Sequence, residues 1–276
     1  MGILLLRLLI LLNDKDVDST DYFIAKTLLM NYHSLSEMSI NEVAKMCFVS
    51  KSTISKFIRT INFENYADFR EAAIFKENRY GFSLNYNQNI MNFVEGNNFD
   101  TYFDIVKNDI DDLKKNIPIK EIQKLANLLN NYKNIAAFGL LFSEFAALDL
   151  QGKLAYNGKF ISTNLDDVKQ DVFIKNSKED TLIILYSNSG LYFEKYQMVD
   201  YLINKNFANT KAKIVLITSN KKIAKNPNVD LSICYNHLSE VQTHSVIYPL
   251  INDFIVAEYR KIKNKTPQNW GVFYLI

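Results

Sequence analysis

The chain has 276 residues, enough for one large domain or two of ordinary size, and 48% of them are hydrophobic, which is ample for buried cores. Its 32 Lys and Arg residues nearly balance its 30 Asp and Glu residues, so the formal net charge is only +2. This balance excludes a globally basic nucleic-acid binder, and any contact with DNA must depend on a local cluster of cations. Two domains are our starting expectation.

The two cysteines, Cys47 and Cys234, stand far apart, each in an apolar run. This placement favours neither a metal site nor a disulfide scaffold. We therefore expect no metal and no cofactor, and a reducing, cytoplasmic environment.

The chain opens with the apolar run MGILLLRLLILLNDKD. This run has no basic leader and no small-residue cleavage site, Arg7 interrupts it, and it is shorter than the roughly 20 residues that a membrane span requires. We expect a buried helix over residues 3–12 and no association with a membrane.

Residues 39–61 have the pattern of two short helices joined by a tight turn. Ser39 and Glu42 have capping-box spacing for a first helix, and Ser50 can cap a second one after the short segment FVS. Apolar residues of the second helix fall at i, i+3, i+4 and i+7, which predicts one buried stripe. The pattern indicates a helix-turn-helix.

The opposite face of this second helix is cationic and rich in hydroxyl groups, and no carboxylate occurs from residue 45 to 61. A positive face is common on ordinary solvated helices, so it indicates DNA binding only together with the helix-turn-helix pattern. In that context we predict that the helix contacts double-stranded operator DNA through Ser50, Lys51, Ser52, Thr53, Ser55, Lys56 and Arg59.

The stretch MSINEVAKMCFVSKSTISKFIRTINFENYADFREA resembles the N-terminal domain of RpiR-type transcriptional regulators. Two residues depart from the family pattern. Phe48 replaces the usual turn glycine and could instead plug the gap between the two helices. Asn62 replaces the glycine after the recognition helix, and asparagine tolerates the left-handed backbone expected there.

From Phe99 onward the pattern changes. Two helices separated by Pro118 precede five short apolar runs that we expect to be buried strands: NIAAFG, KFIST, TLIILYS, KIVLIT and VDLSICY. Helical stretches between them, SEFAALDLQGKLAYNG and LYFEKYQMVDYLINKN, predict a three-layer α/β domain with a parallel sheet covered on both faces. We divide the chain into an all-α helix-turn-helix domain (1–77), an Asn-rich linker (78–98) and this α/β domain (99–276).

Two strand-to-helix loops, in FGLLFSE and LYSNSGLYFE, carry serines where helix N-termini offer free N–H groups and a positive dipole end. With the strand order, they resemble the loops of the sugar isomerase (SIS) domain, which bind phosphosugars. The resemblance implies a phosphosugar effector and the ligand-binding residues Gly139, Ser143, Ser187, Asn188, Ser189 and Tyr192.

Alternatives stay open for these loops. The serines could merely cap helices. Leu141 replaces the second glycine of the family's first loop and narrows the mouth of the site. Tyr192 replaces a hydroxyl residue of the second loop, so its own hydroxyl could hold phosphate or its ring could fill the space of the sugar.

The resemblance implies a transcriptional regulator that works as a homodimer or higher homo-oligomer, with apolar helices at 3–12 and 242–260 as the expected contact surface. One alternative is a sugar-phosphate isomerase, for which His237, Glu240 and His244 are the candidate bases. We find none of them convincing and predict no catalytic residue and no enzyme. A second alternative is a regulator whose SIS-like domain is a ligand-free dimerisation scaffold.

Overall fold

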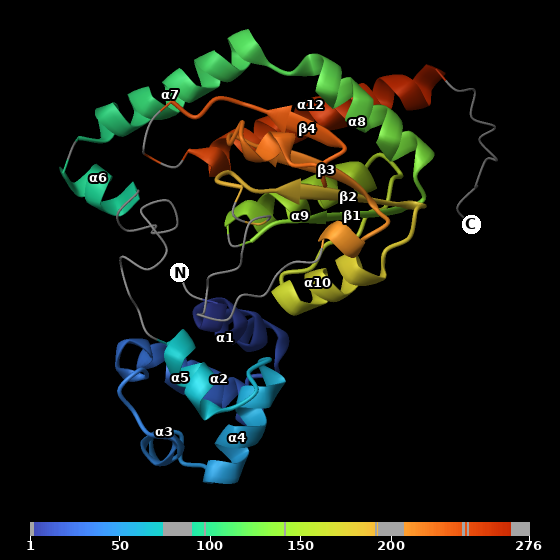
Figure 1. The fold of residues 1–276 in the computed structure, drawn as a ribbon. Coiled ribbons are helices and arrows are strands. Elements are labelled where there is room, and N and C mark those ends of the chain that lie inside the picture. Colours follow the sequence, from blue (N-terminus) through green and yellow to red (C-terminus); the bar gives the residue numbers. More distant parts are fainter. Residues whose placement is uncertain are drawn as a thin grey trace, which may run out of the picture.

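The computed structural model describes residues 3–73, 90–96, 98–140, 142–190, 192, 207–238, 241 and 243–265. The chain forms a helical N-terminal domain and a larger α/β domain that lies against it (Figure 1). The predicted fold class is confirmed.

The N-terminal domain consists of α1 (Ile3–Asp14), α2 (Thr20–Met30), α3 (Ile40–Met46), α4 (Lys51–Thr60) and α5 (Tyr66–Ala72). Their apolar faces share one core that includes Leu4, Leu8, Ile24, Phe57 and Phe69. Helix α1 is therefore the buried helix expected at the start of the chain. In the part of the chain that the structure describes, no helix combines the length and apolar character needed to cross a membrane.

Both predicted helix caps are confirmed. The Ser39 hydroxyl accepts a hydrogen bond from the Glu42 N–H, and the Glu42 carboxylate accepts one from the Ser39 N–H, which completes a capping box on α3. Ser50 caps α4 by accepting from the Thr53 N–H at 3.1 Å. These local bonds fix where the two helices begin.

The turn between α3 and α4 has an unusual residue in an unusual conformation. Phe48 has a φ of 51°, the left-handed region that glycine normally occupies, and its side chain is 88% exposed. The idea that Phe48 plugs the gap between the helices is therefore wrong. Asn62 has a φ of 62°, which confirms the left-handed backbone expected after α4.

Within the predicted linker, residues 78–89 lie outside the described residues, and Asn92–Gly96 form the short helix α6. Helices α7 (Phe99–Asn116) and α8 (Ile119–Asn131) follow, divided at Pro118 as expected. The domain boundaries themselves stay a prediction.

In the described part of the chain, four strands form one parallel sheet in the order β1-β2-β3-β4: β1 (Asn134–Phe138), β2 (Thr181–Tyr186), β3 (Lys213–Thr218) and β4 (Leu231–Cys234). The run KFIST was expected to be a strand, and this is wrong. It makes only an isolated parallel bridge, Ala136 to Ser162, because its chain touches the edge of β1 for one residue before turning away.

Alternating strand residues build a core on each face of the sheet. On one face Ile135, Ile184 and Val215 pack under α8, α9 (Phe142–Ala155) and α12 (His244–Lys265). On the other face Phe138 and Leu185 pack against α10 (Asp167–Asn176) and the turn Phe207–Asn209, so the predicted three layers are confirmed (Figure 1). The helix expected over 191–206 lies outside the described residues except for Tyr192.

Candidate functional site

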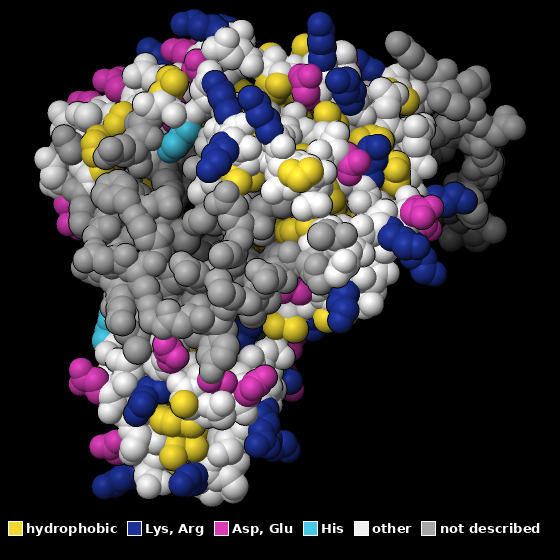
Figure 2. All heavy atoms as spheres, in the orientation of Figure 1, with side chains coloured by type: hydrophobic (Ala, Val, Ile, Leu, Met, Phe, Trp, Pro, Cys, Tyr) yellow, Lys and Arg dark blue, Asp and Glu magenta, His cyan; other side chains and the backbone are white. Residues whose placement is uncertain are grey.

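Helices α3 and α4 lie at the end of the N-terminal domain that points away from the α/β domain (Figure 1). Lys and Arg side chains surround this end of the molecule in Figure 2. On α4 the side chains of Lys51, Ser52, Lys56 and Arg59 are exposed, whereas Thr53 and Ser55 are half-buried. We call Lys51, Ser52, Ser55, Lys56 and Arg59 the recognition face.

Within the described ranges, the recognition face carries positive charge that no acidic side chain neutralises. Among the described residues, no carboxylate forms an ion pair with Lys51, Lys56 or Arg59. Ser50, also predicted to contact DNA, uses its hydroxyl within the protein, 2.7 Å from the Ser52 hydroxyl and 2.8 Å from the Thr53 hydroxyl. Ser50 can therefore contact DNA through its backbone, or through its hydroxyl once these hydrogen bonds rearrange.

The second candidate site lies at the carboxyl ends of the strands. The bridging segment at Ser162 flanks β1 on one side, and β2, which follows it in the chain, flanks β1 on the other. The order of the chain thus reverses between β1 and β2, the point where open α/β sheets collect ligands. We call the segments 139–143 and 187–190, which leave these two strands, the strand-end loops.

The first strand-end loop turns tightly into α9 at Gly139. A Cβ atom at this position would lie 2.5 Å from the backbone carbon of Ser143, so only glycine fits. The Gly139 N–H donates to the Glu144 carboxylate at 2.6 Å, and Glu144 is only 2% exposed. Thr163 and Gln170 also donate to this carboxylate. Leu141 lies outside the described residues.

The second strand-end loop is held by residues that follow β3 and β4. The Asn188 carbonyl accepts from the hydroxyls of Thr218 and Ser219, and the Asn188 side chain accepts from the Tyr235 hydroxyl at 2.5 Å. The Ser189 carbonyl accepts from Asn220 at 2.7 Å. The loop is thus set by contacts that are distant in the sequence.

Ser187 and Tyr192 are turned toward the protein interior. The Ser187 hydroxyl accepts from the Tyr192 N–H at 3.2 Å, a capping arrangement. Tyr192 is 2% exposed, its hydroxyl donates to the Gln170 side chain at 2.6 Å, and its ring packs in the core beside Phe207. Burial raises the pKa of Tyr192 well above its ordinary value, so it acts as a hydroxyl donor.

A cluster of buried tyrosines packs behind the second strand-end loop. Tyr248 of α12 lies between Tyr186 and Tyr235, with ring centroids 5.1 Å and 5.7 Å away. Burial raises the pKa of Tyr248 above its ordinary value. Tyr248 therefore packs its ring between the last residue of β2, Tyr186, and Tyr235, which holds the second loop.

The candidate bases of the isomerase alternative are only partly described. His237 Nδ1 lies 3.6 Å from Asp109, a buried carboxylate on α7. Burial favours the protonated form of Asp109, but the nearby His237 and hydrogen bonds from Thr243 and the Leu238 N–H together hold its pKa below the ordinary value. Glu240 and the side chain of His244 lie outside the described residues.

A groove of about 340 Å³ lies beside this pair, on α7 and the segment after β4. Several carboxylates line it, which makes it unsuited to a phosphate group. Its lining residues are Ile105, Asn108, Asp109, Asp111, Asp112, Lys115 and Leu238. Over the described ranges, the His, Cys, Asp and Glu side chains form no cluster that could hold a metal ion.

Residues 8–75 match the model of the helix-turn-helix domain of the rpiR family. The N-terminal domain is similar to that domain. The match runs from within α1 to beyond α5 and confirms the resemblance to RpiR-type proteins over the residues that suggested it. No curated protein matches the sequence.

One solved structure extends the likeness to the α/β domain. The NanR protein of Vibrio vulnificus, complexed with ManNAc-6P, is 16% identical over 95% of this chain and 93% of its own, with a TM-score of 0.51. At this identity the likeness shows a shared fold. The sugar isomerase domain of an RpiR transcription factor from Sphaerobacter thermophilus is 15% identical over 59% of this chain and 97% of its own, with a TM-score of 0.40.

Sequence reasoning missed several residues that shape the strand-end loops. Glu144, Gln170 and Tyr235 all bond to loop atoms, yet each stands in a segment whose pattern predicts only a helix or a strand end. Their contacts span from 5 to 47 positions along the chain. The local sequence carries a signal only for Asp166, an aspartate at the N-cap position immediately before α10.

Proposed function

We propose that this chain is a DNA-binding transcriptional regulator whose SIS-like domain senses a phosphosugar and joins two copies of the chain. The observation that carries the proposal is the recognition face: exposed cations and hydroxyls on the second helix of an rpiR-family helix-turn-helix, at the free end of the molecule. Such a helix places its N-terminal residues against base edges in the major groove. Cytoplasmic localisation follows from this role.

The test for DNA binding uses Lys56→Ala and Arg59→Ala on a duplex that the wild-type chain selects from random sequences. We expect each variant to bind at least about fivefold more weakly, because a lost base or phosphate contact is worth roughly 1–3 kcal/mol. For a phosphate contact, the slope of log affinity against log salt should also fall by about 0.9.

Lys26→Ala is the matched control, since Lys26 is an exposed cation of the same domain on α2. It changes the net charge equally and should leave affinity nearly unchanged. Equal affinity and equal salt slope for the wild type and both recognition-face variants would refute the assignment.

Phosphosugar sensing draws support from the position of the strand-end loops at the point where strand order reverses, with Ser143 at the start of α9. NanR of the same fold is complexed with ManNAc-6P. We propose that the phosphate contacts Gly139, Ser143, Ser187, Asn188 and Ser189, and that Tyr192 supports the site from behind through its bond to Gln170.

A thermal-melting screen against ManNAc-6P and other hexose and pentose phosphates tests this. A ligand at about a hundred times its dissociation constant adds roughly 2.7 kcal/mol to the free energy of unfolding. Ser189→Ala should reduce the shift of any hit, whereas Ser162→Ala, an exposed serine on the bridging segment, should not. The same compounds should show no isomerase turnover, and turnover abolished by Glu240→Gln would refute the non-enzyme assignment.

One observation favours the ligand-free scaffold as a second candidate. The buried Glu144 carboxylate already accepts the Gly139 N–H, which a bound phosphate would otherwise use, and its charge repels an anion. A protein that binds DNA normally but shows no melting shift with any phosphosugar would fit the scaffold, and Glu144→Gln would then be the variant to screen next.

We propose a homodimer at least, because two recognition helices related by a twofold axis can read half-sites roughly 34 Å apart. Helix α1 buries most of its apolar side chains in the core of its own domain, whereas α9 and α12 expose Phe145, Leu148 and Phe254. We therefore favour α9 and α12 as the contact surface. A light-scattering mass equal to one 32.0 kDa chain plus the operator duplex, measured on the complex, would contradict dimerisation.

A further inference from the structure

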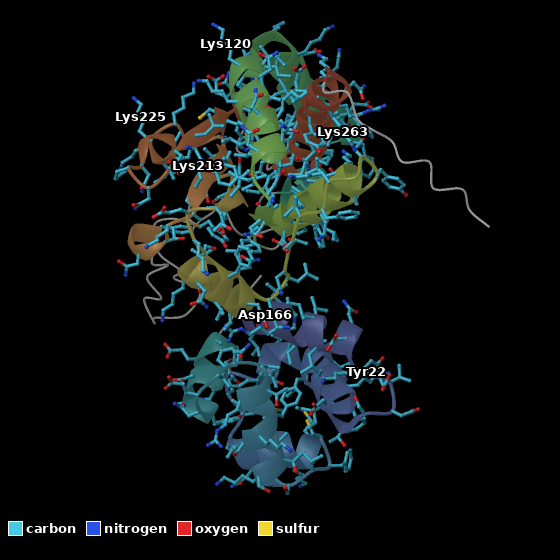
Figure 3. All side chains as sticks on the ribbon, turned by 90° about the vertical axis from the view of Figure 1, so that its right-hand side faces the viewer. Tyr22, Lys120, Asp166, Lys213, Lys225 and Lys263 are labelled. Atoms are coloured by element: carbon cyan, nitrogen blue, oxygen red, sulfur yellow. The ribbon has the colours of Figure 1, made fainter. Side chains whose placement is uncertain are left out.

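Arg7 of α1 joins the two domains. Its Nε and Nη2 donate to the two carboxylate oxygens of Asp167, the first residue of α10, at 3.3 Å and 3.2 Å. This is a two-pronged ion pair, and both side chains are almost fully buried, with exposed fractions of 8% and 5%. Asp166, the neighbouring cap of α10, lies at the junction of the domains in Figure 3.

The third nitrogen of Arg7 holds the end of the recognition helix. Nη1 donates to the carbonyls of Ile61 and Asn62, at 3.2 Å and 2.8 Å, immediately after α4. The guanidinium also stands over the Phe63 ring, 4.8 Å from its centroid. A cation at a helix C-terminus interacts favourably with the helix dipole, so Arg7 stabilises this position of α4.

On the other side of the ion pair, α10 reaches the strand-end loops. Gln170, one turn after Asp167, is fully buried, and its side-chain amide donates to the Gly139 carbonyl at 2.9 Å. The same side chain accepts from the Tyr192 hydroxyl and donates to Glu144. One helical turn of α10 therefore bonds to both loop regions and to the N-terminal domain.

We propose that the Arg7–Asp167 ion pair couples the strand-end loops to the recognition helix, a regulatory device that rests on the proposed function of those loops as a phosphosugar site. An anion at the Gly139 N–H competes with the Glu144 carboxylate, which disturbs Gln170 and shifts α10. The ion pair then breaks, and because a buried charge without a partner is costly, the two domains separate so that water reaches both groups. The ligand thus favours a separated arrangement and frees the two recognition helices to change their spacing.

Hydrogen exchange of the full chain tests the coupling without DNA or ligand. Asp167→Asn keeps the shape of the side chain and removes its charge. We expect the amides of Asn62 and Phe63 at one end, and of Gly139 and Tyr192 at the other, to exchange at least about fivefold faster. The amides of α3 and α12, outside the path, should keep their rates, which excludes a general loss of stability.

Asp166→Asn is the matched control. It removes the same charge one residue earlier and keeps the cap, because asparagine caps helices as well as aspartate does. If Asp167→Asn does not fold, Arg7→Lys keeps the positive charge, loses the two-pronged geometry and should show the same pattern to a smaller extent.

Faster exchange at Asn62 and Phe63 with unchanged Gly139 and Tyr192 would overturn the proposal, as would an equal effect of Asp166→Asn. The expected exchange pattern together with no ManNAc-6P or other phosphosugar binding would instead reject the sensor function and leave the coupling intact. If a phosphosugar does bind, its effect on DNA affinity should fall at least about fivefold in Asp167→Asn.

Discussion

The recognition face and the strand-end loops both carry hydroxyl side chains at the start of a helix, but they use them differently. Lys51, Lys56 and Arg59 reach into solvent from α4, whose position is fixed by apolar residues on its other side. In the loops, Ser187, Tyr192 and the Asn188 side chain are bonded within the protein. One site is a surface that a stable helix presents, whereas the other is a network that exists only when the domain is folded.

The largest expected effect on the free energy of unfolding is at Gly139, in the first strand-end loop, where tight packing rather than solvent surrounds the backbone. Because its Cβ would overlap the Ser143 backbone, Gly139→Ala should lower the free energy of unfolding by about 2–3 kcal/mol, measured by urea denaturation of the α/β domain. Gly152→Ala, in open space on α9, should instead raise it by up to about 1 kcal/mol. Equal effects of the two changes would refute the tight first loop.

A smaller effect is expected at Tyr192. Tyr192→Phe keeps the ring in the core and leaves the buried Gln170 oxygen without its donor, so the free energy of unfolding should fall by roughly 1–2 kcal/mol. If Tyr192→Phe has the same urea midpoint as the wild type, the Tyr192 hydroxyl does not stabilise the network.

A pH experiment probes the N-terminal core behind the recognition face. Cys47 is fully buried, and burial raises the pKa of its thiol to about 11. Since the unfolded thiol ionises nearer 9, the folded state retains its proton while the unfolded state loses it, and stability falls as the pH rises through this window. Between pH 8 and 10 the loss should be about 1 kcal/mol.

The comparison variant for this experiment is Cys47→Ala, in which that part of the decline in unfolding free energy should disappear. A wild-type curve that stays parallel to the Cys47→Ala curve over the same pH range would mean that the thiol is not shielded in the folded state.

The smallest expected effect concerns Phe48 in the turn. A side chain in the left-handed region costs about 1–2 kcal/mol, and glycine removes this cost. Glycine also makes the unfolded chain more flexible, which offsets part of the gain. Phe48→Gly should therefore raise the free energy of unfolding by at most about 1 kcal/mol. If this variant is more stable but binds DNA less well, the exposed ring belongs to the recognition face. A less stable variant would show that the ring has a packing partner.

The sequence by itself determined most of the elements and the recognition face. The capping pairs at Ser39 and Ser50, the apolar stripe of α4 and the left-handed Asn62 depend on residues within a few positions of one another, so their spacing carries the information. The strands at 134–138, 181–186, 213–218 and 231–234 follow from continuous apolar runs for the same reason. The run at 159–163 has this composition too, but a strand needs a partner over several residues, and β1 offers one bridge.

Only the tertiary structure decided how the strand-end loops and the domain junction are built. Nothing in the local sequence marks Gln170 as a bridge between Gly139 and Tyr192, or Arg7 as the partner of Asp167, 160 positions away. In the sequence Arg7 only interrupts an apolar run. Its structural role depends on the Asp167 carboxylate and the Ile61 and Asn62 carbonyls, which folding places beside it. Buried polar groups must find hydrogen-bonding partners in the folded chain, and those partners are chosen by packing in space rather than by distance along the sequence.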